Sequence, residues 1–247
     1  MHDYLIFRIY GPMAAWGDIA VGEYRPSFAH PSKSAIIGLL AAALGIRRDE
    51  QAKQKALAET CSFAVRVDAM GTLLRDYHTT QVPSAKRGVT HYTRRSELAV
   101  DDLNTILSTR DYRCDAAYTV AVEIHKGSPY TAQELANALT KPIFTLYLGR
   151  KSCPLALPLN PQVKSAATLK EVFESVTFSS DELPGVIKPG PDSFSMIYWE
   201  EGQESGLDEE QIITRRDAPL NRIRWQFAER REHYCSLKKE DKACSSQ

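Results

Sequence analysis

Two short segments place cations where the backbone itself favours an anion. In HPSKSAIIG (30–38) they stand at the start of a predicted helix, where unpaired N–H groups and the helix dipole attract phosphate. In YLGRKSC (147–153) they follow a glycine turn, a pattern typical of an anion-binding nest. An ordinary helix cap or a solvated turn explains either segment alone, but together they favour phosphate binding. The side chains concerned are Lys33 and Ser34 in the first segment and Arg150, Lys151 and Ser152 in the second.

A third basic stretch, 72–95, mixes cations with aromatic rings. It carries five Arg or Lys residues against one acid, a net charge of +4. Rings beside guanidinium groups suit base stacking combined with phosphate contact, so this composition predicts contact with RNA or DNA, with a solvated charged surface as the plain alternative. The cations are Arg75, Lys86, Arg87, Arg94 and Arg95, and the rings are those of Tyr77, His78, His91 and Tyr92.

Asp76 and His78 have the spacing for acid–base chemistry, because side chains two residues apart on a strand share a face. A histidine that makes a structural hydrogen bond or stacks on a base is the simpler interpretation. The chain has no GxSxG, HExxH, Walker A or helix-opening GxGxxG motif, and its histidines do not lie at metal-ligand spacing. We therefore expect neither a metal nor a cofactor.

The formal net charge of zero over 247 residues hides an uneven distribution. Residues 178–211 hold nine acids and one base, a net charge of −8, whereas residues 212–239 hold eight bases and three acids, a net charge of +5. Overall neutrality therefore does not exclude a nucleic-acid partner. Hydrophobic and charged contents of 43% and 25% exclude disordered, collagen-like and coiled-coil classes.

The chain carries no signal of export or membrane insertion. No apolar run reaches the roughly 18 residues that a transmembrane helix needs, and the N-terminus lacks the basic region of a signal peptide. The five cysteines are odd in number and widely spaced, which favours a reducing compartment. We expect a cytoplasmic protein without membrane contact.

The elements that must position these residues form an α+β pattern. Strand, helix, strand, insertion, strand, helix, strand is the order of a ferredoxin-like domain, predicted for 1–150 with the insertion at about 70–115. A short helix is expected inside the insertion, near Val100–Leu107, and capping signals at Ser32, Gly45 and Thr131–Glu134 delimit two helices. The predicted strands are 4–10, 63–69, 117–124 and 143–148, and the predicted helices are 34–46, 49–59 and 131–139.

Beyond residue 150 the composition becomes rich in proline and turns. Strands are predicted at 193–200, 211–216 and near 233–237, so 151–247 is expected to form a small, mainly β C-terminal domain. The side chains expected in the cores are Ile36, Ile37, Leu39, Leu40 and Leu44 in the first domain, Trp199 and Trp225 in the second, and Cys153 as a small buried hydrophobe.

Several strings of the chain resemble the CasD-type subunits of type I-E CRISPR Cascade, within the RAMP superfamily of RNA-binding proteins. The resemblance runs from Met1 to about Leu159 and returns at 215–234, while the acidic stretch matches poorly and the insertion matches only at its ends. The strings are GPMAAWG (11–17), RPSFAHPSKSAIIGLLAAALGI (25–46), RDYHTTQ (75–81), DYRCDAAYTVAV (111–122), KPIFTLYLGRKSCPLALPL (141–159) and QFAERREHY (226–234).

The resemblance implies a ferredoxin-like RAMP domain whose insertion is a protruding hairpin, or thumb. It also implies that the subunit captures the repeat-derived 5′ handle of the guide RNA and caps the backbone filament. The implied partners are the guide RNA, the backbone subunit CasC, the large subunit CasA, and further subunits and target DNA through the complex. By position, the handle-binding residues would be Trp16, Gly17, Arg25, Lys33, Ser34, Tyr77, His78, Arg150, Lys151 and Ser152, with Arg94 and Arg95 on the thumb.

Two other hypotheses stay open beside non-catalytic RNA binding. A related branch of the superfamily cleaves precursor guide RNA without metal, and His78 with Lys86 or Arg75 could supply the base and the cation. The matched strings are those of the branch in which a separate subunit cuts, which favours binding without catalysis. The third hypothesis is a purely protein-binding scaffold that docks through the acidic stretch.

Overall fold

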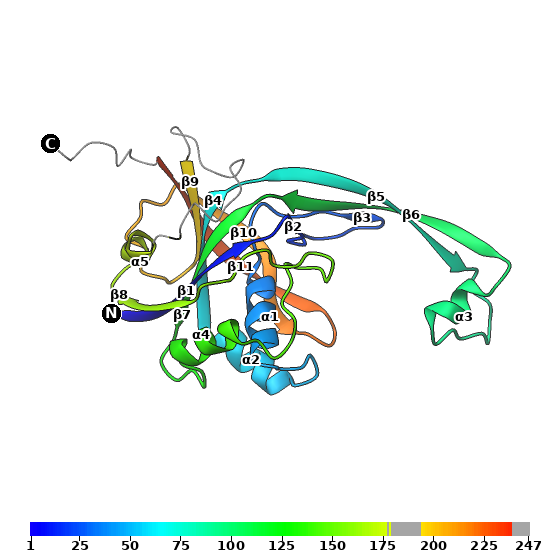
Figure 1. Ribbon diagram of the computed structural model, residues 1–247, viewed down its shortest axis with the longest axis horizontal. Coiled ribbons are helices and arrows are strands. Elements are labelled where there is room, and N and C mark those ends of the chain that lie inside the picture. The colour runs from blue at the N-terminus through cyan, green and yellow to red at the C-terminus, as the bar shows by residue number, and fades with distance from the viewer. Residues whose placement is uncertain (177, 179–193, 239–247) are drawn as a thin grey trace.

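A large antiparallel sheet organises the computed structural model, which describes residues 1–176, 178 and 194–238 (Figure 1). Its seven strands run in the order β10-β11-β9-β4-β7-β1-β8, and each neighbouring pair is antiparallel. The strands are β1 (His2–Tyr10), β4 (Cys61–Ala69), β7 (Ala117–Ile124), β8 (Gln162–Ala166), β9 (Phe194–Glu200), β10 (Gln211–Asn221) and β11 (Gln226–Lys238).

Both faces of the central strands are covered, as the apolar composition of 4–10 predicts. Leu5, Phe7 and Ile9 pack under helices α1 (Lys33–Ala43), α2 (Gln51–Glu59) and α4 (Ala132–Thr140). The alternating side chains Tyr4 and Ile6 pack on the other face, with α5 (Leu169–Ser175). The buried residues predicted in 34–46 are confirmed, except that Leu44 is half-buried.

The predicted capping residues of the helices are confirmed. The Ser32 hydroxyl accepts the N–H of Ala35, and Gly45, with φ +72°, follows the helix that ends at Ala43. Thr131 and Glu134 form the reciprocal capping box of α4. Because these signals lie in the local sequence, they locate helix ends independently of the tertiary fold.

The insertion forms a long hairpin, and the helix predicted near Val100–Leu107 is wrong. Strands β5 (Thr72–Pro83) and β6 (Leu103–Cys114) pair without interruption from Thr72–Cys114 to Pro83–Leu103. The helix lies earlier, as α3 (Arg94–Leu98), because Thr93 and Ser96 cap it reciprocally. Figure 1 shows the hairpin projecting far beyond the sheet, with α3 at its distal end.

The strand predicted at 143–148 is also wrong. The N–H groups of Ile143 and Phe144 donate to the carbonyls of Ala43 and Ala42, so this apolar segment covers the C-terminal end of α1 instead of pairing in the sheet. The strand beside β1 is β8, in the proline-rich region where none was predicted. Helix α5 was likewise not predicted.

The C-terminal strands extend the same sheet through the pairing of β9 with β4. The strands predicted at 211–216 and 233–237 are confirmed, as is the one predicted at 193–200 from Phe194 onward, residue 193 lying outside the described residues, whereas the domain boundary near residue 150 stays a prediction. Trp199 is buried as expected, but Trp225 is 58% exposed at the turn between β10 and β11, so its predicted core position is wrong. Among the described residues, no helix is long and apolar enough to cross a membrane.

Candidate nucleic-acid interface

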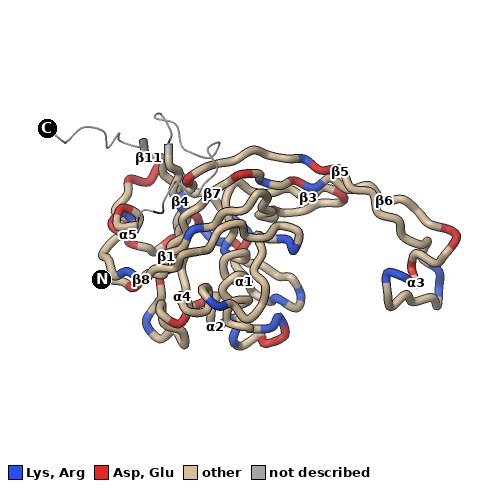
Figure 2. Tube along the Cα trace, in the orientation of Figure 1, with Lys and Arg blue, Asp and Glu red and all other residues tan. Residues whose placement is uncertain are grey.

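The base of the long hairpin gathers cations on one face. Two short strands, β2 (Met13–Ala14) and β3 (Tyr24–Arg25), join β6 there and widen the ribbon. The register sets Arg25 opposite Arg110, and Arg110 opposite Asp76, so these three side chains share a face. Figure 2 shows basic residues near β3 and again around α3, with an uncharged stretch between them.

The turn that carries Arg150 lies against this base. Ala15 N–H donates to the Leu148 carbonyl at 3.0 Å, and Gly149 has φ +82°. A Cβ at Gly149 would lie 1.8 Å from the Ala15 carbonyl oxygen, so only glycine permits this approach. The Arg150 guanidinium then lies 4.9 Å from the centre of the Tyr112 ring, on the face shared with Arg110.

Several guanidinium nitrogens at this base have no acceptor. Arg110 Nε, Arg113 Nε and Arg150 Nη1 are buried from solvent and have no hydrogen-bond partner within the described part of the chain. Buried donors without acceptors are costly, and a phosphate oxygen is a strong acceptor for guanidinium groups. We name Arg25, Arg110, Arg150 and Lys151 the arginine face, whereas the register puts Arg113 on the opposite face of β6.

On the opposite face of the hairpin, which also carries Arg113, Asp111 is paired with Arg75 and Tyr24. Arg75 donates to both Asp111 carboxylate oxygens, at 2.9 and 3.1 Å, and Tyr24 donates to Asp111 at 2.6 Å. The hydrogen bond from Arg75 lowers the pKa of Asp111, and the bond to Asp111 raises the pKa of Tyr24. Tyr77, 65% exposed, shares this face with Arg75, so it points away from its chain neighbour His78.

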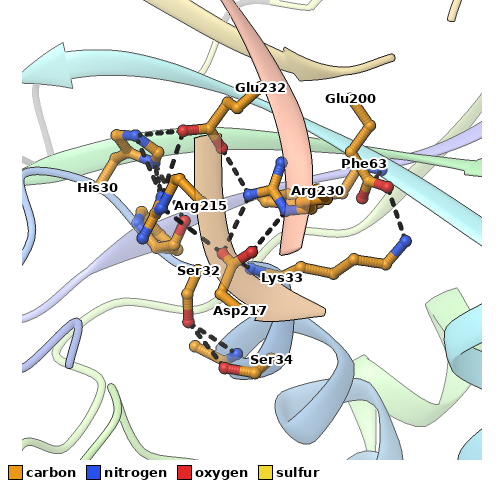
Figure 3. A network of polar contacts seen from close by, with 12 residues as sticks. His30, Ser32, Lys33, Ser34, Phe63, Glu200, Arg215, Asp217, Arg230 and Glu232 are labelled. Atoms are coloured by element: carbon orange, nitrogen blue, oxygen red, sulfur yellow. Dashed lines mark hydrogen bonds and ion pairs between the residues drawn. The ribbon is translucent and has the colours of Figure 1, made fainter. Parts of the chain in front are cut away.

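The start of α1 is occupied by carboxylates of the chain itself (Figure 3). The N–H of Lys33 donates to Asp217 Oδ2 at 2.9 Å, where a phosphate would have to sit. The Lys33 ammonium lies 2.6 Å from Glu200 Oε2 and is 12% exposed. This corrects the expectation of a phosphate site at 30–38, since the chain supplies the anions for both the helix end and the lysine.

Those carboxylates belong to a buried ionic network between α1 and the C-terminal strands. Arg230 contacts Asp217 Oδ1 and Glu232 Oε1, each at 2.6 Å, and His30 Nε2 lies 3.2 Å from Glu232 Oε2. Burial would raise the pKa of Glu232, but the hydrogen bond from His30 and the charges of His30, Arg215 and Arg230 lower it to about 2. Burial lowers the pKa of His30.

The other predicted site residues divide between buried and exposed positions. Trp16 is buried and donates its indole N–H to the Tyr118 hydroxyl at 3.1 Å, so its ring cannot stack on a base. Gly17 pairs with Ser27 in an isolated bridge, and the Ser34 hydroxyl lies 3.0 Å from that of Ser32. Exposed residues are Arg25, Arg94 and Arg95, with Lys151 and Ser152 beside Arg150.

The side chains of the cleavage hypothesis are not brought together. His78 Nε2 lies 2.7 Å from Asp76 Oδ2, as their spacing predicted. Arg75 faces the other side of the ribbon, and Lys86 lies beyond the last paired residue of β5, Pro83. At about 3.3 Å per residue, the five residues from His78 to Pro83 alone span roughly 17 Å.

Sequence reasoning did not single out Arg110, Tyr112 and Arg113. Tyr112 and Arg113 lie in the string DYRCDAAYTVAV, but their roles depend on which strand β6 pairs with, and no local pattern specified β3. The usable signal was the run RDYRC (110–114), in which Arg110 and Tyr112 are two residues apart and would share a face once the segment is read as a strand, with Arg113 on the other face.

The chain is similar in sequence to CRISPR-associated proteins. A family model described as "CRISPR-associated protein (Cas_Cas5)" matches residues 4–233. The chain is 35% identical over 238 residues to the "CRISPR system Cascade subunit CasD" of Escherichia coli (strain K12), covering 93% of this chain and 94% of that protein.

Two solved structures share the fold. One, described as "CRISPR RNA-guided surveillance complex", has a TM-score of 0.66 at 24% identity and covers 95% of this chain and 90% of its own. Another, described as "Crystal structure of Cas protein", has a TM-score of 0.61 at 27% identity and covers 96% of this chain and 95% of its own.

Proposed function

The chain belongs to the Cas5 family of CRISPR-associated proteins, and from that premise we propose that it is a non-catalytic, guide-RNA-binding subunit of a Cascade-type surveillance complex. The Escherichia coli relative is by name a Cascade subunit, and the similarity extends over nearly its whole length. The proposal places the protein in antiviral defence, in the cytoplasm.

The arginine face is the observation that carries RNA binding. Two buried guanidinium nitrogens there, Arg110 Nε and Arg150 Nη1, have no acceptor among the described residues, and Arg150 lies over the Tyr112 ring. Phosphate oxygens would satisfy those donors, and a ring beside them suits a base. The one acid in the row, Asp76, is paired with His78.

The finer parts of the proposal rest on the resemblance together with the shape of the chain. We propose that strands β4, β7, β1 and β8 with α1 and α4 make up a ferredoxin-like unit. Along the chain these elements follow one another as strand, helix, strand, strand, helix, strand, and in the sheet the strands lie side by side in the order β4-β7-β1-β8, as that fold requires. The long hairpin is proposed to reach the backbone subunit CasC, with Arg94 and Arg95 at its distal end, while the arginine face holds the 5′ handle. CasA and the remaining subunits would then bind elsewhere on the complex.

Non-catalytic binding is favoured over cleavage because His78, Arg75 and Lys86 do not converge on one point. Incubating the purified chain with repeat RNA in EDTA tests this directly. We expect intact RNA; metal-independent cutting that His78→Ala abolishes would reverse the assignment.

Fluorescence anisotropy with a labelled 5′-handle RNA tests the arginine face. Arg110→Gln combined with Arg150→Gln should weaken binding by about 30-fold and reduce the slope of log K against log salt by about 1.4, since each lost single-strand phosphate contact contributes about 0.7. Lys164→Gln, an exposed cation on β8, is the matched control and should change neither quantity. Equal affinity and slope in the double variant and the wild type would refute the proposal.

A further inference from the structure

Trp225 occupies a position that packing does not explain. It is 58% exposed at the turn between β10 and β11, while Trp16 and Trp199 are 1% and 4% exposed. Its φ of +51° is a conformation that non-glycine residues rarely adopt. The turn therefore holds a large apolar ring in solvent at a conformational cost.

Arg48 packs against one face of the Trp225 ring. Its guanidinium lies 4.2 Å from the Trp225 ring centre, a cation–π contact. The same group donates to the carbonyls of Arg222 at 2.7 Å and Ile223 at 3.2 Å, so it is anchored to the turn. One face of the indole is thus held by a cation, and the ring is oriented before any ligand arrives.

Further cations are chain neighbours of this pair. Arg224 precedes Trp225 and is exposed, and its side chain has no partner in the parts of the chain that the structure describes; Arg47 precedes Arg48 and is exposed, and its charge acts on Glu50. Arg222 is anchored to the Ser34 carbonyl, while its Nε is buried without an acceptor among those residues. Of the nearby acids, Glu50 is paired with Lys53 at 2.6 Å, and Asp49, which follows Arg48, is exposed.

The segment 143–150 runs from the end of α1 to the arginine face. It leaves the end of α1 at Ile143 and reaches the Gly149–Arg150 turn. The side chains of Ile143, Phe144 and Tyr147 along it are exposed. The arginine face and the loop after α1 that carries Arg48 therefore lie at the two ends of one segment with exposed apolar and aromatic side chains.

We propose that Trp225, backed by Arg48, is a stacking platform for a base of single-stranded RNA, a second contact beyond the arginine face. The inference rests on the proposed RNA-binding function and extends it. Alternation of rings and cations along an exposed path is how proteins bind single strands without reading their sequence. A protein partner is the competing occupant and is separated by the test below.

Tryptophan fluorescence of the full-length chain tests the platform, because Trp225 is the exposed tryptophan. Titration with a single-stranded RNA 12-mer of mixed sequence should quench the emission, and Trp225→Ala should abolish the quenching and weaken binding about tenfold. Trp225→Phe should retain most of the affinity. Leu220→Ala, on the same hairpin but against α2, is the control and should bind like the wild type.

An abasic 12-mer with the same phosphates separates stacking from charge attraction. It should bind the wild type about tenfold more weakly than the normal RNA and should not distinguish the wild type from Trp225→Ala. Equal binding of both RNAs to the wild type would overturn the platform, as would a Trp225→Ala effect confined to capture of Cascade proteins after RNase treatment.

The outcomes also separate this inference from the function on which it rests. If Arg110→Gln with Arg150→Gln weakens RNA binding while Trp225→Ala does not, the platform is refuted and the arginine face stands. If the wild type binds no RNA, both are refuted.

Discussion

The start of α1 and the Gly149–Arg150 turn both look like anion-binding sites in the sequence, but they differ in the structure in whether the chain itself supplies the anion. Each combines a cation with backbone suited to an anion. At α1, Asp217 and Glu200 fill the anion positions and Lys33 is almost buried. At the turn, Arg150 Nη1 is buried without an acceptor among the described residues, as is Arg110 Nε on the adjacent strand β6. The first region has its anions supplied by the chain, whereas the second has buried donors without an acceptor among the described residues.

The difference lies in residues far away along the chain. Lys33 bonds to residues 167 and 184 positions later, so no window around it could show that its partners are internal. A local sequence pattern can show that a segment favours an anion, but not whether the chain itself provides that anion. Cations at a helix start thus become evidence for a ligand only when the fold has been searched for carboxylates.

The largest expected effect is on stability, from Glu232→Gln. The change leaves Arg215, Arg230 and His30 buried around a neutral amide, so the free energy of unfolding should fall by about 3–5 kcal/mol. Glu229→Gln, an exposed acid on the same strand, should cost under about 0.5 kcal/mol. Urea unfolding measures both, and equal midpoints would show that the network is not a structural core.

Acid should weaken the same network. Because the folded pKa of Glu232 is about 2 against 4.5 when unfolded, its stabilisation is complete above pH 4.5 and is lost as the pH falls toward 2. That shift corresponds to about 3 kcal/mol. Burial lowers the pKa of His30 in the folded protein, so the unfolded chain takes up this proton first. The free energy of unfolding therefore falls further as the pH drops below 6.5, the ordinary pKa of histidine.

Urea unfolding from pH 7 to pH 2 checks this dependence. The stability gap between the wild type and Glu232→Gln should narrow by about 3 kcal/mol over the acid range. A gap that stays constant with pH would contradict the assigned pKa.

A smaller effect separates the two regions most directly. Lys33→Met should cost about 2 kcal/mol, because Glu200 loses its cation but keeps the N–H of Phe63. RNA affinity and its salt slope should stay unchanged below the melting temperature. A reduced slope in anisotropy titrations would mean that Lys33 contacts phosphate after all.

The smallest effect should come from Asp76→Asn, which removes the acid from the row Arg25–Arg110–Asp76. The exposed pair with His78 contributes at most about 0.5 kcal/mol to stability. RNA binding should tighten about twofold at low salt and show no change at 1 M salt, where charge interactions are screened. Weaker binding would place Asp76 in direct contact with the ligand.

Features that depend on neighbouring residues alone, such as helix ends and alternating strands, could be predicted from the sequence. Ser32, Gly45 and the Thr131–Glu134 capping box marked real helix ends, and alternation located β1, β4 and β7. The segment 143–148 failed because its strand-like pattern packs on α1, and β8 was missed because prolines surround it.

The candidate site was half predictable for a related reason. Arg150 and Lys151 stood out beside a glycine turn, but Arg110 and Arg113 gain their position from the long-range pairing of β6 with β5, β2 and β3. Trp225 was assigned to a core because apolar rings usually are buried, and the positive φ that exposes it has no signature in the sequence.

The pairing of β4 with β9 has a consequence for how the chain is made. All residues of the arginine face precede Cys153 in the chain. The edge of β4, however, stays unpaired until Phe194–Glu200 has been synthesised. The ion-pair partners of Lys33 and His30, Glu200 and Glu232, also come late in the sequence. Contacts this distant in sequence form slowly, and an unpaired edge invites aggregation. A chain cut short before β9 therefore carries the residues of the arginine face without the strand that covers the edge of β4, so folding has to await the C-terminal strands.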